Sequence, residues 1–205
     1  MRRLASTEPG PRPWHDQRVI ETIREATPAD GDAIAAVNVS SWQRGYRGLL
    51  PEEVLAGLSV AELGPRWTAG LRAGVARVGT LLACRGDEVV GFSTVGPLRD
   101  PEAAADRAAA DRAETGVDLG ELRTLYVHPE HWRLGIGNRL HAAALRKLAA
   151  LGFRQAVLFV LVNNDRAISF YRQAGWTPDG GRKTSTGPAG VQLNEIRFRQ
   201  ALPAD

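Results

Sequence analysis

The sequence predicts a single-domain α/β fold in which helices pack against a mixed sheet. Residues 122–127 favour a strand, and the glycine turn at residues 135–137 then leads into an alanine- and leucine-rich helix. Residues 155–162 form a nearly continuous apolar run, which is typical of a strand buried on both faces. Residues 191–199 alternate apolar and polar side chains, which indicates a strand with one buried face. Strands that alternate with helices in this way predict a mixed α/β sheet.

The N-terminal half supplies the other expected elements. Residues 1–17 are rich in proline and lack apolar periodicity, so we expect a flexible tail ahead of a domain over residues 18–200. The alternating stretch from Arg18 predicts a first strand, and Thr27-Pro28 predicts a helix start with Thr27 as N-cap. Glycines should end that helix within residues 41–48. We also expect helices over 51–57 and 61–71, and a hairpin of strands over 79–84 and 88–95.

The remaining segments are predicted to be loops, apart from one more helix. Residues 98–116 are rich in Ala, Asp, Glu and Arg and offer no apolar face, so we expect a surface insertion, with a lid as the alternative. A helix that begins at residues 163–165 should run through Tyr171. The Gly-Gly and Gly-Pro pairs in residues 179–190 predict a loop, and residues 201–205 should form a short tail.

The composition narrows the function classes. The 205 residues carry a formal charge of +3, which favours a mixed surface and is also compatible with an acidic cofactor. A nucleic-acid-binding protein would cluster its basic residues more sharply, so we expect no nucleic acid partner. The one cysteine, Cys84, cannot form an internal disulfide and should be a small core residue. No apolar run reaches the ~20 residues of a membrane helix, and Arg2-Arg3 precedes no signal core, so we expect a cytoplasmic protein without membrane contact.

The glycine turn at residues 135–137 is the main candidate for a binding site. A strand, a glycine loop and a helix present free backbone amides at the positive end of a helix dipole, which suits a phosphate group. The dinucleotide fingerprint would need a third glycine where Leu140 stands, and the nearest match to a mononucleotide loop has Gly181 in place of its lysine. These two nucleotide-binding motifs are therefore excluded, and we expect the loop to bind the pyrophosphate of another kind of cofactor.

A second group of residues follows this loop after the predicted helix and buried strand. The two groups are Leu125-Tyr126-Val127-x-Pro129 with Gly135-Ile136-Gly137, and then Asn164, Ala167, Phe170-Tyr171 and Gly175-Trp176. Together they resemble the GNAT superfamily of CoA-dependent N-acetyltransferases, and the looser resemblance extends over residues 19–199. One position departs from the family pattern, because Trp132 stands where a glutamine or arginine is usual.

The resemblance implies a mostly antiparallel sheet whose central parallel strands, residues 122–127 and 156–162, splay apart. It also implies acetyl-CoA as cosubstrate. The pantetheine arm would bond the backbone of Leu125, Tyr126 and Val127 like an added strand, and Asn164 would either contact the cofactor or only cap its helix. The pyrophosphate would lie on the backbone amides of Arg133, Leu134, Gly135, Ile136, Gly137 and Asn138.

Acetyl transfer to an amine requires a base and an acid. A lysine-like amine has a pKa near ~10.4, so at pH 7 the neutral nucleophile costs about 4–5 kcal/mol. The resemblance implies Glu121 as the candidate base, because it opens the strand before the glycine loop at a spacing similar to that of the catalytic glutamate in some family members; an exposed charge at a strand start is the alternative. Tyr171 matches the position of the acid that protonates the leaving thiolate and would contact the cofactor, whereas the alternative is a tyrosine packed on the sheet. His128 and His131 are expected to be turn residues.

The acceptor site should lie outside the cofactor-binding segments. Trp42 and Tyr46 follow the first helix stripe in a glycine-rich stretch and are candidate substrate contacts, or else core anchors. No cluster of His, Cys or Asp has metal-ligand spacing, so no metal is expected. We therefore predict an N-acetyltransferase for a small-molecule amine, as a monomer or homodimer. The alternatives are a CoA-binding regulatory module without catalysis, and an enzyme that acetylates a protein N-terminus or lysine.

Overall fold

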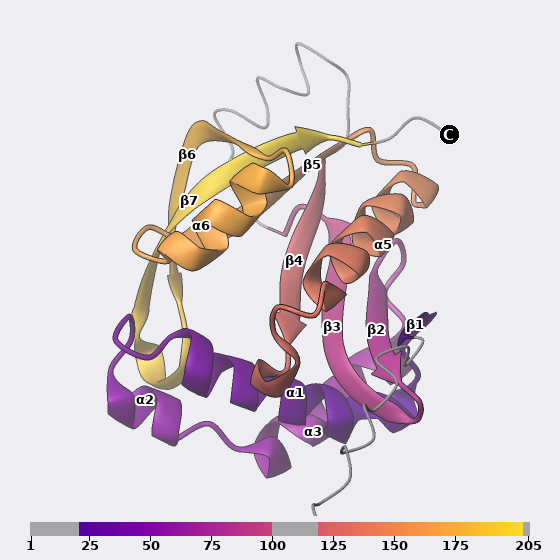
Figure 1. The fold of residues 1–205 in the computed structure, drawn as a ribbon, viewed down its shortest axis with the longest axis vertical. Coiled ribbons are helices and arrows are strands. Elements are labelled where there is room, and N and C mark those ends of the chain that lie inside the picture. Colours follow the sequence, from indigo (N-terminus) through magenta and orange to yellow (C-terminus); the bar gives the residue numbers. More distant parts are fainter. Residues whose placement is uncertain (1–20, 100–118, 203–205) are drawn as a thin grey trace, which may run out of the picture.

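The computed structural model describes residues 21–99 and 119–202, and its centre is one seven-stranded sheet with the order β1-β2-β3-β4-β5-β7-β6 (Figure 1). β4 and β5 run parallel, and all other neighbouring strands are antiparallel, which confirms the predicted fold class. The strands are β1 Glu21–Glu25, β2 Gly79–Arg85, β3 Glu88–Pro97, β4 Leu119–Val127, β5 Gln155–Leu161, β6 Thr177–Thr186 and β7 Gln192–Ala201.

The two central strands pair over a short stretch only. β4 pairs with β5 from Leu119 to Glu121, opposite Gln155 to Val157. Beyond Glu121, β4 continues to Val127 and β5 to Leu161 without further pairing between them. The strands therefore splay apart towards their C-terminal ends, as predicted, and Figure 1 shows the opening between β4 and the β5–β7 part of the sheet.

A β-bulge in β4 lies at the point where the strands separate. Thr94 and Val95 of β3 face Thr124 and Leu122, so Arg123 is the extra residue of β4. A bulge bends its strand and increases the local twist. Because this bulge lies only two residues beyond Glu121, the last residue that pairs with β5, it turns β4 away from its parallel neighbour.

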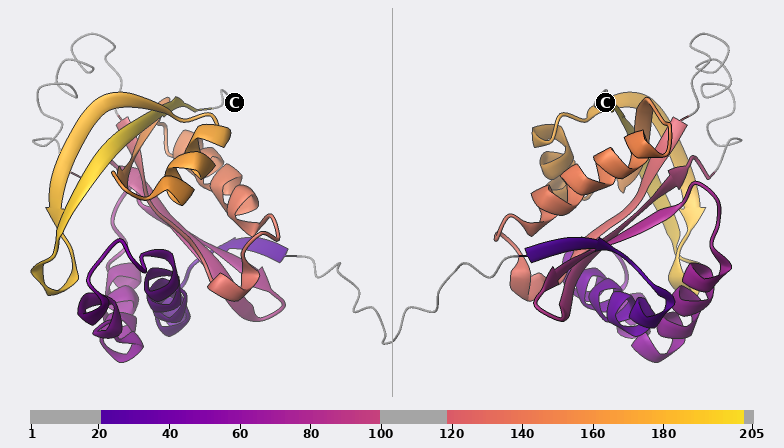
Figure 2. Two further views of the ribbon diagram at one scale, coloured as in Figure 1. Left: turned by 60° about the vertical axis from the view of Figure 1, so that its left-hand side comes forward. Right: turned by 90° about the vertical axis from the view of Figure 1, so that its right-hand side faces the viewer.

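Helices cover both faces of the sheet (Figure 2). The three N-terminal helices pack on one face, and the two helices that follow β4 and β5 pack on the other face. The segment before α1 is a short 3-10 helix that starts after Thr27, as the sequence predicted. The helices are α1 Gly31–Gly45, α2 Glu52–Ala56, α3 Val60–Ala73, α5 Ile136–Ala150 and α6 Asp165–Gln173, with 3-10 turns η1 Pro28–Asp30, η2 Pro129–His131 and η3 Pro188–Gly190.

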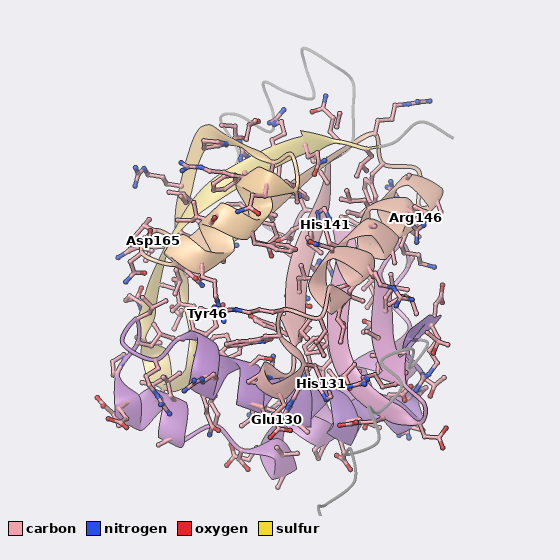
Figure 3. All side chains as sticks on the ribbon, in the orientation of Figure 1. Tyr46, Glu130, His131, His141, Arg146 and Asp165 are labelled. Atoms are coloured by element: carbon pink, nitrogen blue, oxygen red, sulfur yellow. The ribbon has the colours of Figure 1, made fainter. Side chains whose placement is uncertain are left out.

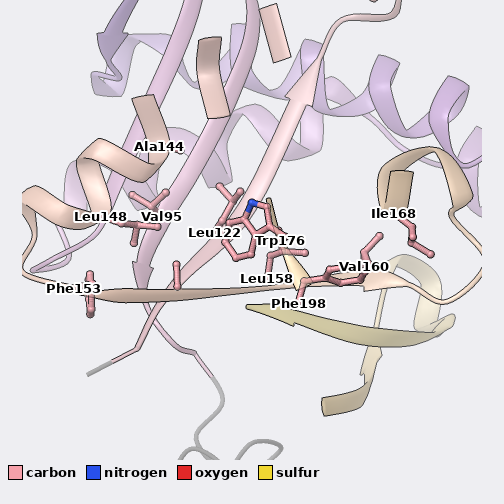
Figure 4. Close-up of a cluster of buried hydrophobic side chains, with 11 residues drawn as sticks. Val95, Leu122, Ala144, Leu148, Phe153, Leu158, Val160, Ile168, Trp176 and Phe198 are labelled. Carbon is pink, nitrogen blue, oxygen red and sulfur yellow. The ribbon is translucent and has the colours of Figure 1, made fainter. Parts of the chain in front are cut away.

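Two hydrophobic clusters fix these layers to the sheet. The larger one lies under α5 and α6 and is drawn in Figure 4. Its centre is Trp176, which is 1% exposed and joins the end of α6 to the sheet. The second cluster joins α1 and α3 to the opposite face through Ile34 and Phe92, and it includes the buried Cys84, as expected. The larger cluster consists of Val95, Leu122, Ala144, Leu148, Phe153, Ala156, Leu158, Val160, Ile168, Trp176 and Phe198.

The predicted loop over residues 179–190 is wrong for most of its length, because β6 Thr177–Thr186 is an edge strand that pairs with β7. The Gly180-Gly181 pair that indicated a loop lies in a bulge between Pro178 and Arg182, whereas the Gly187-Pro188 pair lies at the turn around η3. At a sheet edge, a proline without an N–H group and a glycine bulge are tolerated. Only the turn around η3 remains non-strand.

Several expectations concern residues outside the described ranges. These are the tail over residues 1–17, the start of the first strand before residue 21, and residues 100–118, which contain most of the expected insertion. β7 runs through Ala201, and the N–H of Leu202 donates to the carbonyl of Arg154, so the described chain continues past residue 200.

Two glycines allow α1 and α3 to approach closely. A Cβ at Gly31 would lie 2.8 Å from the carbonyl oxygen of Gly64 and also against Thr68 Oγ1, and a Cβ at Gly64 would meet the Asp32 carboxylate. Since backbone atoms cannot move aside as a flexible side chain does, position 31 needs glycine, whereas at position 64 the Asp32 side chain would have to move. The close α1–α3 contact holds the helix that carries Trp42 and Tyr46.

We predict that Gly31→Ala destabilises the fold by roughly 1–3 kcal/mol, because the added methyl group overpacks the α1–α3 contact. Gly70→Ala in α3 is the matched control, since a Cβ at that position would have no neighbouring atom within 4 Å. That change should be neutral or stabilise by up to about 1 kcal/mol through helix propensity. Urea unfolding followed by circular dichroism measures both values, and equal effects of the two changes would contradict the assignment.

Candidate active site

The loop between β4 and α5 forms a cradle of unpaired amides. The first backbone bond of α5 runs from the N–H of Arg139 to the carbonyl of Gly135, at 3.2 Å. Within the described chain, no acceptor pairs with the backbone N–H groups of residues 133–138. Gly135 and Arg133 have φ values of 81° and 64°, which turn the chain sharply into the helix. Free amides at the positive end of a helix dipole form a site for an anion.

Trp132 ties this loop to the end of β4. Its indole N–H donates to the carbonyl of Val127 at 2.6 Å, and the Ser41 hydroxyl of α1 donates to the same oxygen at 3.0 Å. The guanidinium of Arg166, from α6, lies 4.0 Å from the centre of the Trp132 ring. The residue that departs from the family pattern therefore connects β4, α1 and α6 around the opening.

The free edge of β4 faces the gap. The N–H of His128 donates to the carbonyl of Val90, so residues of the same parity, including Tyr126, direct their backbone groups towards β3. Leu125 and Val127 direct theirs away from β3, towards the gap. Because the Val127 carbonyl is already occupied, Leu125 and the N–H of Val127 offer the backbone groups that a strand-like ligand can bond.

Tyr171 lies on α6 beside this gap. Its hydroxyl has no hydrogen-bond partner within the described chain, and its ring packs edge-on against Phe170 and Trp176. Burial raises the pKa of Tyr171, and the nearby Tyr46 adds to the rise, so the hydroxyl stays protonated. Asn164 does cap α6, because its side-chain oxygen accepts from the N–H of Ala167 at 3.1 Å. Its amide nitrogen is not used by that bond.

Trp42 and Tyr46 come together with Tyr126 at the end of α1. The rings of Trp42 and Tyr46 lie 4.8 Å apart, and the hydroxyls of Tyr46 and Tyr126 are 3.5 Å apart. The buried indole N–H of Trp42 has no hydrogen-bond partner within the described chain, although it lies close enough to the Tyr126 hydroxyl to oppose the rise in its pKa. Figure 3 shows Tyr46 between α1 and α6.

Glu121 is buried at the narrow end of the gap. It is 5% exposed, so the alternative of an exposed charge is wrong. Its carboxylate accepts from the backbone N–H of Arg99 at 3.0 Å and lies 3.8 Å from the Arg123 side chain. Because Leu122 packs under α5, the neighbouring Glu121 points to the other face of the sheet.

Sequence reasoning missed His141 and Arg166. His141 lies on α5, points towards α6 (Figure 3), and accepts a hydrogen bond from the indole N–H of Trp176 at 2.8 Å. Burial lowers its pKa, which favours the neutral ring that this bond requires. The only sequence signal was its place on the apolar stripe of α5 beside Leu140. His131 lies in η2 as expected and contacts Arg85 and Glu88.

Neither a metal site nor a membrane helix emerges from residues 21–99 and 119–202. In these ranges no group of three or more His, Cys, Asp and Glu side chains could hold a metal ion. The helices there are too short or too polar to cross a bilayer.

Comparison with known proteins assigns the fold and this loop to a family. A sequence model of the acetyltransferase (GNAT) family matches residues 52–176, which include the amide cradle and Tyr171. The chain belongs to the GNAT acetyltransferase family. Members of this family are acyltransferases that act on amine acceptors.

Relatives and solved structures agree with this GNAT assignment. Over 175 residues the chain is 29% identical to uncharacterized N-acetyltransferase YuaI of Bacillus subtilis, which covers 85% of this chain and 90% of that protein. The PaiA N-acetyltransferase of Thermoplasma acidophilum, solved in complex with coenzyme A, superimposes with a TM-score of 0.61 at 19% identity, over 88% of this chain and 98% of that one. YncA of Salmonella typhimurium, solved with acetyl-CoA, has a TM-score of 0.59 at 17% identity, over 90% and 95%.

The three tyrosines of this GNAT chain, Tyr46, Tyr126 and Tyr171, should all resist ionisation at pH 10. Burial is the largest cause that raises each of their pKa values above the ordinary value of about 10. The native protein should therefore show little tyrosinate absorbance at that pH, and adding denaturant at the same pH should release it. Because the folded pKa values are raised, the associated stability is present below pH ~10 and is lost as the pH rises further. Native titration near pH 10 would contradict the burial of these phenols.

Proposed function

We propose that this chain is an acetyl-CoA-dependent N-acetyltransferase that transfers the acetyl group directly to the primary amine of a small molecule. The observation that carries the proposal is the run of unpaired amides over residues 133–138 beside the free β4 edge. The amides suit a pyrophosphate, and the edge suits an extended amide-containing arm that adds to the sheet as a strand does.

The residues present fit coenzyme A along this path. The start of α5 faces α6 here, since a Cβ at Gly137 would be in ordinary van der Waals contact with the Phe170 ring, 3.7 Å away. The bound acetyl-CoA supplies the thioester that is attacked. Residues that would hold it are Leu125, Val127, Arg133, Leu134, Gly135, Ile136, Gly137, Asn138, Asn164 and Tyr171, whereas the backbone groups of Tyr126 face β3 and are not available to the cofactor.

The proposed acid and base lie on opposite faces of the sheet. Tyr171 packs with the cluster under α5 and α6, whereas Glu121 points to the face that α1 covers. A cofactor from the first face and an amine from the second would meet in the gap between β4 and β5. Glu121 would take the amine proton, directly or through water, and the Tyr171 hydroxyl would protonate the sulfur as the carbon–sulfur bond breaks.

We expect Tyr171→Phe to lower kcat by about 10²-fold or more while acetyl-CoA binding stays nearly unchanged, because the ring remains and only the proton donor is lost. Free thiol release measures turnover, and calorimetry measures binding. Arg172→Gln, an exposed change on the same helix, is the control and should affect neither. Unchanged turnover in Tyr171→Phe would remove the acid role. If the wild-type protein binds acetyl-CoA and releases no thiol with any amine or peptide, a regulatory module replaces this proposal.

We expect Glu121→Gln to lower kcat/KM at pH 7 by roughly 10²–10⁴-fold, because the amide cannot accept the amine proton. The deficit should shrink as the pH approaches the amine pKa of ~10.4, where the nucleophile is already neutral. Glu130→Gln in η2, on an exposed side chain, is the matched control. Thermal unfolding of both variants tests whether the buried carboxylate only stabilises the fold. A deficit that is independent of pH would contradict the base role.

A further inference from the structure

Arg166 is held at the open end of the gap. Its guanidinium lies 4.0 Å from the Trp132 ring centre, and Trp132 is itself fixed by its bond to Val127. On its other side the Arg166 guanidinium lies against α1, because a Cβ at Gly45 would come within 2.8 Å of Arg166 Nη2. The side chain therefore spans from α6 to the loop after β4 and to the last turn of α1.

This guanidinium has no acceptor within the described chain. Arg24, in contrast, forms two bonds of 2.6 and 2.8 Å with Asp30, and Arg197 bonds Asp179 at 2.8 Å. Arg166 is exposed overall, and the partial burial of its guanidinium lowers its pKa without a carboxylate in exchange. A planar group with five N–H donors, stacked on one face, keeps its edge free for two parallel bonds to an oxyanion.

The neighbouring groups are also hydrogen-bond donors. Tyr46 follows Gly45 directly and carries a hydroxyl that lies 3.5 Å from Tyr126, and the buried Trp42 N–H has no partner in the described part of the chain. The charge of the Glu195 carboxylate contributes to the raised pKa of Tyr46. This carboxylate already accepts a hydrogen bond from the Ser185 hydroxyl at 2.8 Å and lies 3.8 Å from the Lys183 ammonium group. The end of α1 therefore presents donors and a positive charge.

We propose that Arg166 binds an oxyanion of the acceptor, so that the amine substrate carries a carboxylate or phosphoryl group. This inference rests on the proposed acetyltransferase function. In that proposal the unpaired amides of residues 133–138 would serve the phosphates of the cofactor. Arg166 instead touches α1, which carries the candidate acceptor residues Trp42 and Tyr46. A bidentate contact there would orient the amine towards the thioester, so Arg166 is a specificity-determining residue.

The test compares amino acids of increasing chain length with their primary amides, under saturating acetyl-CoA. The wild-type enzyme should prefer the carboxylates. Arg166→Gln should lower kcat/KM for the carboxylates by roughly 10- to 100-fold and for the amides by less than about 3-fold, since it removes charged hydrogen bonds only. Arg166→Lys should recover part of the loss, and the exposed Arg172→Gln should leave all substrates unchanged. Calorimetry of the amino acids with the CoA complex gives the same comparison without turnover.

Four results would overturn the inference. Equal losses for carboxylates and amides would make Arg166 a structural residue. A raised KM for acetyl-CoA, with acceptor preference kept, would assign Arg166 to a cofactor phosphate. Acetylation of amines with no preference for carboxylates in the wild type would refute the inference and leave the proposed function intact. A wild-type protein that acetylates no amine would overturn both.

Discussion

The loss of pairing between β4 and β5 is the constraint on which the rest of the structure depends. The bulge at Arg123 lies two residues beyond Glu121, the last residue of β4 that pairs with β5. Beyond it, the backbone groups of Leu125 and Val127 face a gap instead of a neighbouring strand. In a folded protein, exposed polar backbone groups at a sheet edge require a partner. The gap can be filled by a strand-like ligand, and the same opening lets groups from both faces of the sheet meet.

The structure keeps this gap open by connecting its rim. Trp132 bonds the Val127 carbonyl, Ser41 bonds the same oxygen from α1, and Arg166 stacks on the Trp132 ring from α6. These contacts join the end of β4 to helices on both faces, so the strands do not have to pair in order to be positioned. The close contact of α1 with α3 through Gly31 then fixes the helix that carries Tyr46. The position of the acceptor-side aromatic groups thus depends on glycines far from the opening.

Sequence patterns predicted the parts of this fold that depend on local periodicity. The strand, glycine turn and helix at residues 122–150 lie where expected, and Asn164 caps its helix. β6 was missed because Pro178 and the following glycines have the composition of a loop, and only pairing with β7 makes them an edge strand. The hydrogen bond from Trp132 to Val127 depends on the conformation of a loop. The stacking of Arg166 on Trp132 joins two residues that are distant along the chain. No periodicity encodes such contacts, so the rim of the site could not be derived from the sequence.

The ionisation of the site separates its two proton-transfer tasks. Burial raises the pKa values of Tyr46, Tyr126 and Tyr171, so all three phenols remain donors around neutral pH. Because each of these groups holds its proton, the tyrosines at the wide end of the gap cannot deprotonate an ammonium ion. Glu121, at the narrow end of the gap, is a carboxylate and not a phenol, and it lies on the other face of the sheet. In the proposed mechanism, such a site would supply a proton from the α6 side to the leaving group and remove one from the amine on the α1 side.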